Sequence, residues 1–248
     1  MRQRFSKRAF HISMVIGIVI IIAFIALMMA LKYDVDGETD MPFDVKKISI
    51  ISTVDGQNVE NSTAKWDLNV NQNNDIYVYI EKNENYKKTE TINNVYMDNF
   101  KVINKPMKGN IVFYRPSNNS TSIFQNLDEY RIENINYVGN KNSDMKDMKI
   151  SNQGGIVVFR CSNNGLGEYI SNEDEQIEYN SLLKRIKVVE NEVKMKISFD
   201  MTITLNSGVV FKASNIELEL PYNDIVEKGT VSGDITYLKD MVFKRVEK

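Results

Sequence analysis

Few side chains in this sequence could act as a nucleophile, a base or a soft metal ligand. Cys161 is the only cysteine and His11 the only histidine, so a Cys–His pair would have to join these two residues. His11 lies at the start of an uncharged stretch with the length of a membrane span, which would separate it from the rest of the chain. One histidine and one cysteine also cannot build a zinc site. We therefore predict no catalytic residue, no metal and no cofactor.

Three short motifs superficially resemble the boxes of penicillin-binding proteins. Ser62-Thr63-Ala64-Lys65, Ser162-Asn163-Asn164 and Lys228-Gly229-Thr230 occur in the order of the Ser-x-x-Lys, Ser-x-Asn and Lys-Thr-Gly boxes. That mechanism needs the serine and the lysine on one turn of a helix, whereas Lys65 lies on the polar face of a predicted strand. The third box is scrambled. We interpret the three matches as coincidental.

Carboxylates are the remaining groups that could do chemistry, as Ca²⁺ ligands or as an acid–base pair. The alternating acidic residues at 34–40 do not form a calcium loop, because Val45 occupies the twelfth position, where the bidentate glutamate belongs. We interpret this run, and the acidic run at 173–175, as solvated loop charges. A carboxylate-dependent cell-wall enzyme stays an alternative, since two catalytic carboxylates can be far apart in sequence.

Two tyrosines are the candidate binding residues that spacing singles out. Tyr77 and Tyr79 alternate with Ile76, Val78 and Ile80, so a strand would direct both rings to one face. Such a pair can stack on sugar rings or contact a protein, although aromatic residues also favour strands for packing alone. We predict Tyr77 and Tyr79 as possible partner-binding residues.

The composition is that of a folded protein without a strong overall charge. The 248 residues are 42% hydrophobic, and 31 basic against 33 acidic residues give a formal net charge of −2. No basic surface is expected to attract nucleic acid, and we predict no such partner. The abundance of Asn, Lys and Ile is typical of a low-GC bacterial genome.

The N-terminal region predicts an uncleaved membrane anchor at residues 12–31. These 20 residues carry no charge, and a helix rising about 1.5 Å per residue would span the roughly 30 Å hydrocarbon core. Twelve of them are Ile, Val, Leu or Phe, so insertion gains on the order of −5 kcal/mol. The stretch is longer than a usual signal-peptide core, and Met28-Met29-Ala30 lacks the small residue that a cleavage site requires.

Charges on both sides of the predicted anchor indicate its orientation. Basic residues precede it and acidic residues follow it, which places the N-terminus in the cytoplasm and the C-terminal part outside the plasma membrane. We divide this single-pass chain into a cytoplasmic basic tail at 1–11, a transmembrane anchor at 12–31, an acidic stalk at 32–45 and an extracytoplasmic β domain at 46–248.

Apolar residues in the β domain recur with the period of strands. Alternation over 64–70 predicts a strand with one polar face. Two-sided apolar runs predict central strands at 48–54, 76–80, 111–114 and 156–159. A last strand is expected through Ile235, Tyr237 and Phe243.

The strongest pattern predicts a hairpin at 195–220. Apolar residues occupy every second position of 195–205, Asn206-Ser207-Gly208 supplies a turn, and 210–220 returns with a bulge near 213–216. Phe199 then belongs to the core row and Asp200 to the solvent row. We expect the change Asp200→Ala to cost under about 0.5 kcal/mol.

Two regions depart from the strand pattern. Residues 181–187 predict a short helix with Leu182, Leu183 and Ile186 on one face and Ser181 as its cap. The region 116–153 predicts long loops or a subdomain boundary. Because no long amphipathic helices separate the strands, we predict a mainly β fold: a transmembrane helix followed by an antiparallel β-sandwich-like domain with one short helix.

The predicted anchor has the clearest functional meaning, since no motif specifies a reaction. Tethering raises the effective concentration of weak contacts near the membrane. We therefore expect a non-enzymatic binding or assembly module of the cell envelope, whose partner is an envelope protein or a cell-wall polymer. The alternatives are the carboxylate-dependent cell-wall enzyme and an accessory subunit of a transmembrane signalling complex.

Overall fold

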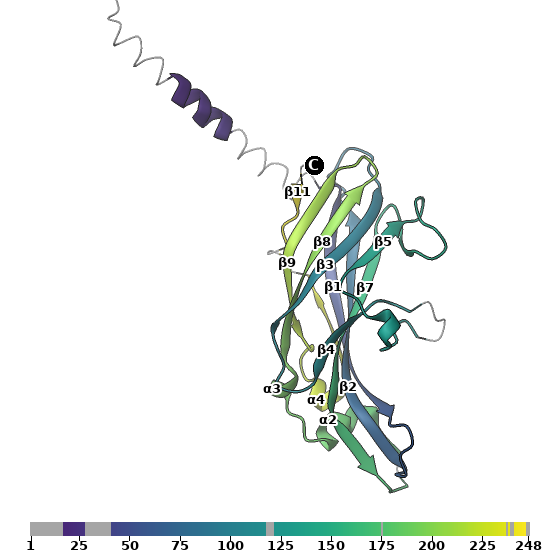
Figure 1. Ribbon diagram of the computed structural model, residues 1–248. Coiled ribbons are helices and arrows are strands. Elements are labelled where there is room, and N and C mark those ends of the chain that lie inside the picture. Colours follow the sequence, from purple (N-terminus) through teal and green to yellow (C-terminus); the bar gives the residue numbers. More distant parts are fainter. Residues whose placement is uncertain are drawn as a thin grey trace, which may run out of the picture.

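The computed structural model describes residues 17–27, 41–117, 122–174, 176–236, 238 and 241–246. Residues 17–27 form a helix, and the residues from Met41 onward form two packed β-sheets with most of the short helices gathered near one end (Figure 1). The expected mainly β, sandwich-like fold with few short helices is confirmed.

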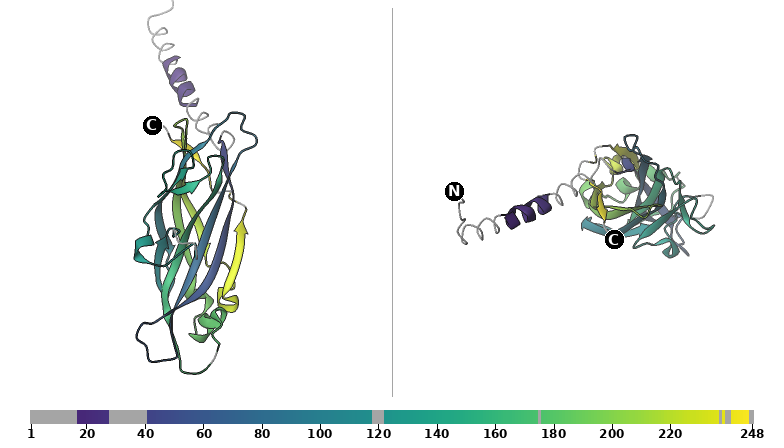
Figure 2. Two further views of the ribbon diagram at one scale, coloured as in Figure 1. Left: turned by 90° about the vertical axis from the view of Figure 1, so that its right-hand side faces the viewer. Right: turned by 90° about the horizontal axis from the view of Figure 1, so that it is seen from above.

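Each sheet draws its strands from distant parts of the chain. Sheet 1 has the order β10 (Thr230–Ile235), β1 (Phe43–Asn58), β2 (Trp66–Lys82), β7 (Gly155–Ser171), β4 (Asn110–Tyr114). Sheet 2 has the order β11 (Lys244–Val246), β9 (Val210–Leu220), β8 (Met195–Leu205), β3 (Ile92–Asn104), β5 (Ile135–Gly139), β6 (Met148–Ile150). Neighbouring strands are antiparallel except for the parallel pair β5 and β6. The strands run along an elongated molecule (Figure 2).

Short helices join some of these strands. They are η2 (Asp128–Tyr130), η3 (Tyr179–Ser181), α2 (Leu182–Arg185), α3 (Glu190–Val193) and α4 (Ile225–Lys228). The helix expected at 181–187 is thus confirmed as α2, with Leu182 and Leu183 buried. Ser181 does not cap it, because its hydroxyl instead donates a hydrogen bond to the backbone oxygen of Glu178 at 2.9 Å.

The core forms where the apolar rows of the two sheets meet. The predicted hairpin is present as β8 and β9, and its register shifts between Phe199 and Met201, as the expected bulge requires. The fully buried Phe199 ring lies 5.1 Å from the Phe159 ring and 5.9 Å from the Phe100 ring, measured between centroids. An aromatic cluster therefore joins sheet 2 to sheet 1.

Strand β2 continues through a polar run whose residue types are typical of turns. The whole run Asn71-Gln72-Asn73-Asn74 is buried. Asn74 Oδ1 accepts hydrogen bonds from Ser52 Oγ of the neighbouring strand β1 at 2.8 Å and from Gln72 Nε2 of β2 itself at 2.9 Å. Asn74 Nδ2 donates to the backbone oxygen of Cys161 at 3.0 Å. We name Ser52 and the run from Asn71 to Asn74 the polar belt. It lies between the main apolar cluster and a second apolar cluster near the short helices.

One long side of the sandwich is closed by a direct link between the sheets. Tyr137 of β5 donates a hydrogen bond from its hydroxyl to the backbone oxygen of Val158 in β7 at 2.7 Å. The same hydroxyl accepts a hydrogen bond from the Val158 N–H at 3.1 Å. Burial raises the pKa of Tyr137, so the hydroxyl stays protonated and can donate this hydrogen bond.

Three element predictions need correction. The run 111–114 lies in β4, which is an edge strand rather than a central one: Ile111 and Phe113 pack against the main apolar cluster, and the loop that follows pairs with β4 through the Tyr114–Arg131 bridge. The expected last strand is two short strands, since the chain crosses from sheet 1 at β10 to sheet 2 at β11; Tyr237 lies outside the described residues. The region 116–153 contributes β5 and β6 to sheet 2.

The N-terminal predictions are only partly covered by the described residues. The stalk proposed at 32–45 is too long, because Met41 and Phe43 are buried in the core and β1 begins at Phe43; residues 32–40 lie outside the described part. The tail at 1–11 and both ends of the predicted anchor at 12–31 lie outside it too. Among the residues that are described, no helix is both long and apolar enough for a membrane span.

Candidate functional site

Tyr77 and Tyr79 lie two positions apart in β2, and both face outward from sheet 1. The residues that alternate with them in β2, Ile76, Val78 and Ile80, are buried in the core. Because β2 is the middle strand of its sheet, both rings are flanked on each side by a neighbouring strand. Each tyrosine is half-buried, which leaves part of each ring accessible. We name this surface the tyrosine face.

The neighbours of the two tyrosines combine apolar and charged groups. Ile156 is opposite Tyr79 on β7 and is 44% exposed. On β1, the Lys47 ammonium lies 4.6 Å from the centroid of the Tyr79 ring and 2.7 Å from the Asp234 carboxylate. That hydrogen bond raises the pKa of Lys47 and lowers the pKa of Asp234. Burial raises the pKa of Tyr77, so its hydroxyl is a neutral donor.

The tyrosine face ends where the loop between β4 and β5 folds onto sheet 1. The guanidinium of Arg160 pairs with Asp75 at 2.6 and 3.0 Å and donates to Asn126 of the loop at 3.2 Å. It also lies 4.8 Å from the ring centroid of Phe124, and Asn126 donates to Asn73 at 2.8 Å. Arg160 therefore holds the loop in place beside the tyrosines.

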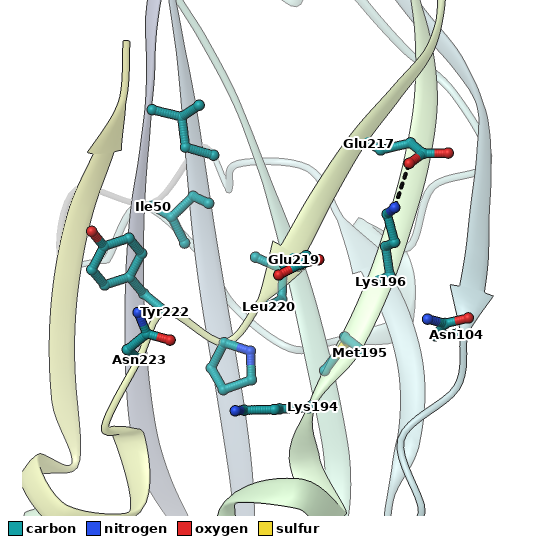
Figure 3. A pocket seen from close by; sticks show the side chains of 12 residues that line it. Ile50, Asn104, Lys194, Met195, Lys196, Glu217, Glu219, Leu220, Tyr222 and Asn223 are labelled. Atoms are coloured by element: carbon teal, nitrogen blue, oxygen red, sulfur yellow. Dashed lines mark ion pairs between the residues drawn. The ribbon is translucent and has the colours of Figure 1, made fainter. Parts of the chain in front are cut away.

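A second candidate site lies between the edges of the two sheets, where β9 of sheet 2 faces β10 of sheet 1 (Figure 3). A hollow of about 530 Å³ opens there, and a second hollow of about 360 Å³ continues it, since both are lined by Glu217 and Ile235. We name the first hollow the side groove. The lining residues that matter below are Ile50, Glu217, Glu219, Leu220, Tyr222 and Ile235.

Tyr222 forms one wall of the side groove because β10 has a glycine where the ring lies. A Cβ atom placed on Gly233 would be 1.9 Å from the Tyr222 ring, so a larger residue would displace the ring. The backbone N–H of Tyr222 donates a hydrogen bond to Ser52 Oγ at 2.9 Å, which ties this wall to the buried polar belt. The wall is therefore fixed from two directions.

The charged residues of the side groove are unevenly paired. Lys196 Nζ lies 2.5 Å from the Glu217 carboxylate, and in the strand register Lys196 is directly opposite Glu219. The hydrogen bond with Glu217 and the charge of Glu219 raise the pKa of Lys196. Lys196 thus faces two carboxylates, a second lysine, Lys194, also lines the groove, and Glu219 makes no ion pair of its own within the described residues.

Two carboxylates meet on the outer face of sheet 2. Asp98 and Asp200 are opposite each other on β3 and β8, and Asp200 is only 6% exposed. The expectation that Asp200 faces open solvent is wrong, because the bulge in β9 brings Asn215 and Lys212 over it: the Asn215 N–H donates at 2.8 Å and Lys212 Nζ lies at 2.9 Å. Burial by itself raises the pKa of Asp200, but these donors outweigh it and lower the pKa. An ionised Asp200 is poorly suited to act as a general acid.

The structure does not assemble the serine and lysine motifs into a catalytic group. Lys65 pairs with Asp174 rather than with Ser62, and Ser162 is buried inside β7. Cys161 is fully buried, and burial raises the pKa of its thiol. Among the described residues, no cluster of three or more His, Cys, Asp and Glu side chains could hold a metal ion.

The sequence predicted the tyrosine face but not the side groove. The available signal was Gly233, two residues before Ile235 of the expected last strand, since an isolated glycine in a strand marks a close approach by another part of the chain. The sequence does not show that Tyr222 makes this approach. Comparison with protein-family models, with curated proteins and with solved structures found no match.

Proposed function

We propose that this protein is a single-pass membrane protein whose β-sandwich is a non-enzymatic binding or assembly module of the cell envelope. Residues 12–31 anchor it in the plasma membrane, with residues 1–11 in the cytoplasm and the sandwich outside. The partner is an envelope protein or a cell-wall polymer.

The helix at residues 17–27 is the observation that carries the membrane part of this proposal. Its eight large apolar side chains are 46 to 61% exposed, so no part of the described chain covers them. Exposed apolar surface costs about 25 cal/mol per Å² in water, and lipid removes that cost. A helix that is apolar on every side is typical of a membrane span, and the uncharged stretch 12–31 has the required length.

The tyrosine face supports the binding part of the proposal. It combines two half-buried aromatic rings, the exposed Ile156 and a Lys47–Asp234 ion pair on a sheet, which is a suitable base for contacts with a partner. A membrane tether makes weak contacts of this kind effective, because it confines both partners to one surface.

Crosslinking on intact cells followed by pull-down tests the proposal. We expect the full-length protein to capture a membrane or wall component more efficiently than the fragment 34–248, because the fragment loses the confinement by the membrane. Equal capture by the fragment would contradict the tethered-binder function. Turnover of wall glycan or peptide by the purified fragment, abolished by changing one Asp or Glu without loss of fold, would favour the carboxylate enzyme instead.

The double variant Tyr77→Ala, Tyr79→Ala tests the tyrosine face within the same experiment. We expect weaker capture with an unchanged far-ultraviolet circular dichroism spectrum, because both rings are only half-buried. Tyr96→Ala is the matched control, since Tyr96 is a half-buried tyrosine on β3 in the other sheet. Unfolding of the double variant would show that the two rings serve packing rather than binding.

A further inference from the structure

We propose that the side groove docks an extended polypeptide segment of an envelope protein, which pairs with the free edge of β9 and places basic side chains beside Glu217 and Glu219. This inference rests on the proposed binding function and specifies the chemistry of one partner. It is independent of the tyrosine face, which lies on the outer side of the other sheet.

The backbone of β9 presents hydrogen-bonding groups that no described strand uses. β8 pairs with β9 along one side, whereas β11 covers only residues 210–212 on the other side. From Ala213 to Leu220 that second side has no strand partner in the described part of the chain. The bulge ends at Ile216, so residues 216–220 keep a regular register. A free edge of this kind accepts an added strand through main-chain hydrogen bonds.

Apolar side chains line the space beside this edge. β9 directs Leu218 and Leu220 inward, and Ile50 of β1 and Ile235 of β10 lie across the groove from them. Three of these side chains are at most 2% exposed, and Ile235 is half-buried. The half-buried Ile235 and Tyr222 therefore offer accessible apolar surface to the side chains of an added strand, and the core beneath them stays closed.

The charges beside the groove select which polypeptide segments can bind there. Glu217 and Glu219 form the outward row of β9 beside the groove, and only Lys196 opposes them across the strand pair. Lys194, the second lysine of the lining, precedes β8 and lies beyond the last register pair, Met195 with Leu220, so both charges that β9 itself carries beside the groove are negative. In an added strand, outward side chains directly opposite these glutamates would have Cβ atoms about 4.5–5.5 Å away. Lysine or arginine there complements the edge, and acidic residues are repelled.

A polypeptide is the class of partner that uses all of these features at once. Its amide groups repeat at the same spacing as those of β9, and its side chains alternate between the groove and the outward row. A glycan has no such repeat. The complementary segment therefore alternates apolar and basic residues in an extended conformation.

Titration of the full-length protein in detergent micelles with labelled peptides tests this inference. The probe is Thr-Val-Lys-Val-Lys-Val-Thr, blocked at both ends, and the comparison peptide has Glu in both Lys positions. We expect saturable binding of the Lys peptide and at least about tenfold weaker binding of the Glu peptide, because like charges face each other in the second complex. Amide hydrogen exchange over residues 216–220 should slow when the Lys peptide is bound.

Reversing the charge of one glutamate beside the groove gives the most specific test. Glu219 is exposed and has no ion pair among the described residues, so Glu219→Lys should fold normally. We expect it to bind the Lys peptide about fivefold more weakly and the Glu peptide more tightly than the wild type does. Glu81→Lys makes the same change on an exposed residue of β2 and should leave both affinities unchanged.

Several results would overturn the inference. They are no binding of the Lys peptide, equal binding of both peptides, unchanged affinities in Glu219→Lys, and unchanged hydrogen exchange over residues 216–220 in the complex. The proposed function fails separately, if the wild-type protein shows no membrane-dependent capture in cells. Capture that persists at wild-type yield in Glu219→Lys would keep the binder function and refute the groove as its contact.

Discussion

Asp200 lies on the outer face of sheet 2, but its side chain is buried and hydrogen-bonded. The Asn215 N–H, the Lys212 ammonium and the side chain of Asn99 all donate to its carboxylate. Removing the carboxylate would leave the Asn215 N–H without a partner at a site that is largely closed to water. An unsatisfied buried donor costs about 1–3 kcal/mol, so the near-neutral substitution expected from strand alternation does not hold.

We predict that Asp200→Asn, which keeps an acceptor oxygen but loses the negative charge beside Lys212, lowers the free energy of unfolding by about 1–3 kcal/mol near neutral pH and that this loss shrinks in acid. The donors lower the folded-state pKa of Asp200 below its unfolded value of about 3.9. The stability from the ionised carboxylate is therefore complete above that unfolded pKa and is lost as the pH falls through the folded pKa. Urea unfolding at about pH 7 and about pH 2 measures the effect.

Asp128→Asn is the control for this pH dependence, because the Asp128 side chain is 88% exposed and pairs with Arg131 on the surface. It should change stability little at either pH. A loss in Asp200→Asn that is the same at both pH values would show that the shape of the side chain matters and its charge does not.

At the scale of the elements, long strands carry two apolar clusters separated by polar side chains. β1 and β2 each run from the main cluster, through Ser52 and Asn74 of the polar belt, into the cluster around Leu68 and Leu183. A strand can carry buried amides only where its neighbours supply the hydrogen bonds, so the belt also selects the register of β1 against β2. The aromatic cluster of Phe100, Phe159 and Phe199 lies in the main cluster and uses both sheets.

We predict that Phe199→Ala lowers the free energy of unfolding by about 3–5 kcal/mol, because it leaves a cavity among closely packed rings. Thr204→Ala, on the outer row of the same strand, should cost under about 0.5 kcal/mol. Chemical denaturation of both variants measures the difference. Similar costs would mean that the inner row of β8 is not the core row.

At the scale of the whole molecule, all buried residues of both apolar clusters come from Met41 onward. We predict that the fragment 34–248, expressed without the proposed anchor, is soluble and gives a circular dichroism spectrum dominated by β-structure. Its core needs no contribution from the helix at 17–27, whose large apolar side chains are exposed. A mainly helical spectrum, or a fragment that folds only in detergent, would contradict this prediction.

The sequence by itself determined those features that depend on the local order of side chains. Alternation in β8, and in β9 on both sides of the point where it slips, specifies which residues face the core, so the hairpin, its bulge and the buried position of Phe199 could be predicted. The shared face of Tyr77 and Tyr79 follows in the same way. Alternation shows on which face a residue lies but not which residues cover that face, so it did not predict that Asn215 and Lys212 cover Asp200.

Only the tertiary structure decided the features that depend on contacts between distant residues. The polar run in β2 is a strand because Ser52 of β1 and the Cys161 backbone of β7 bond to Asn74, and no local pattern contains those partners. The side groove exists because the order of strands brings the edge of β9 opposite β10. Its wall depends on a hydrogen bond between Tyr222 and Ser52, which are 170 positions apart in the chain. Such contacts form only when both sheets are assembled, so no local pattern in the sequence contains the side groove.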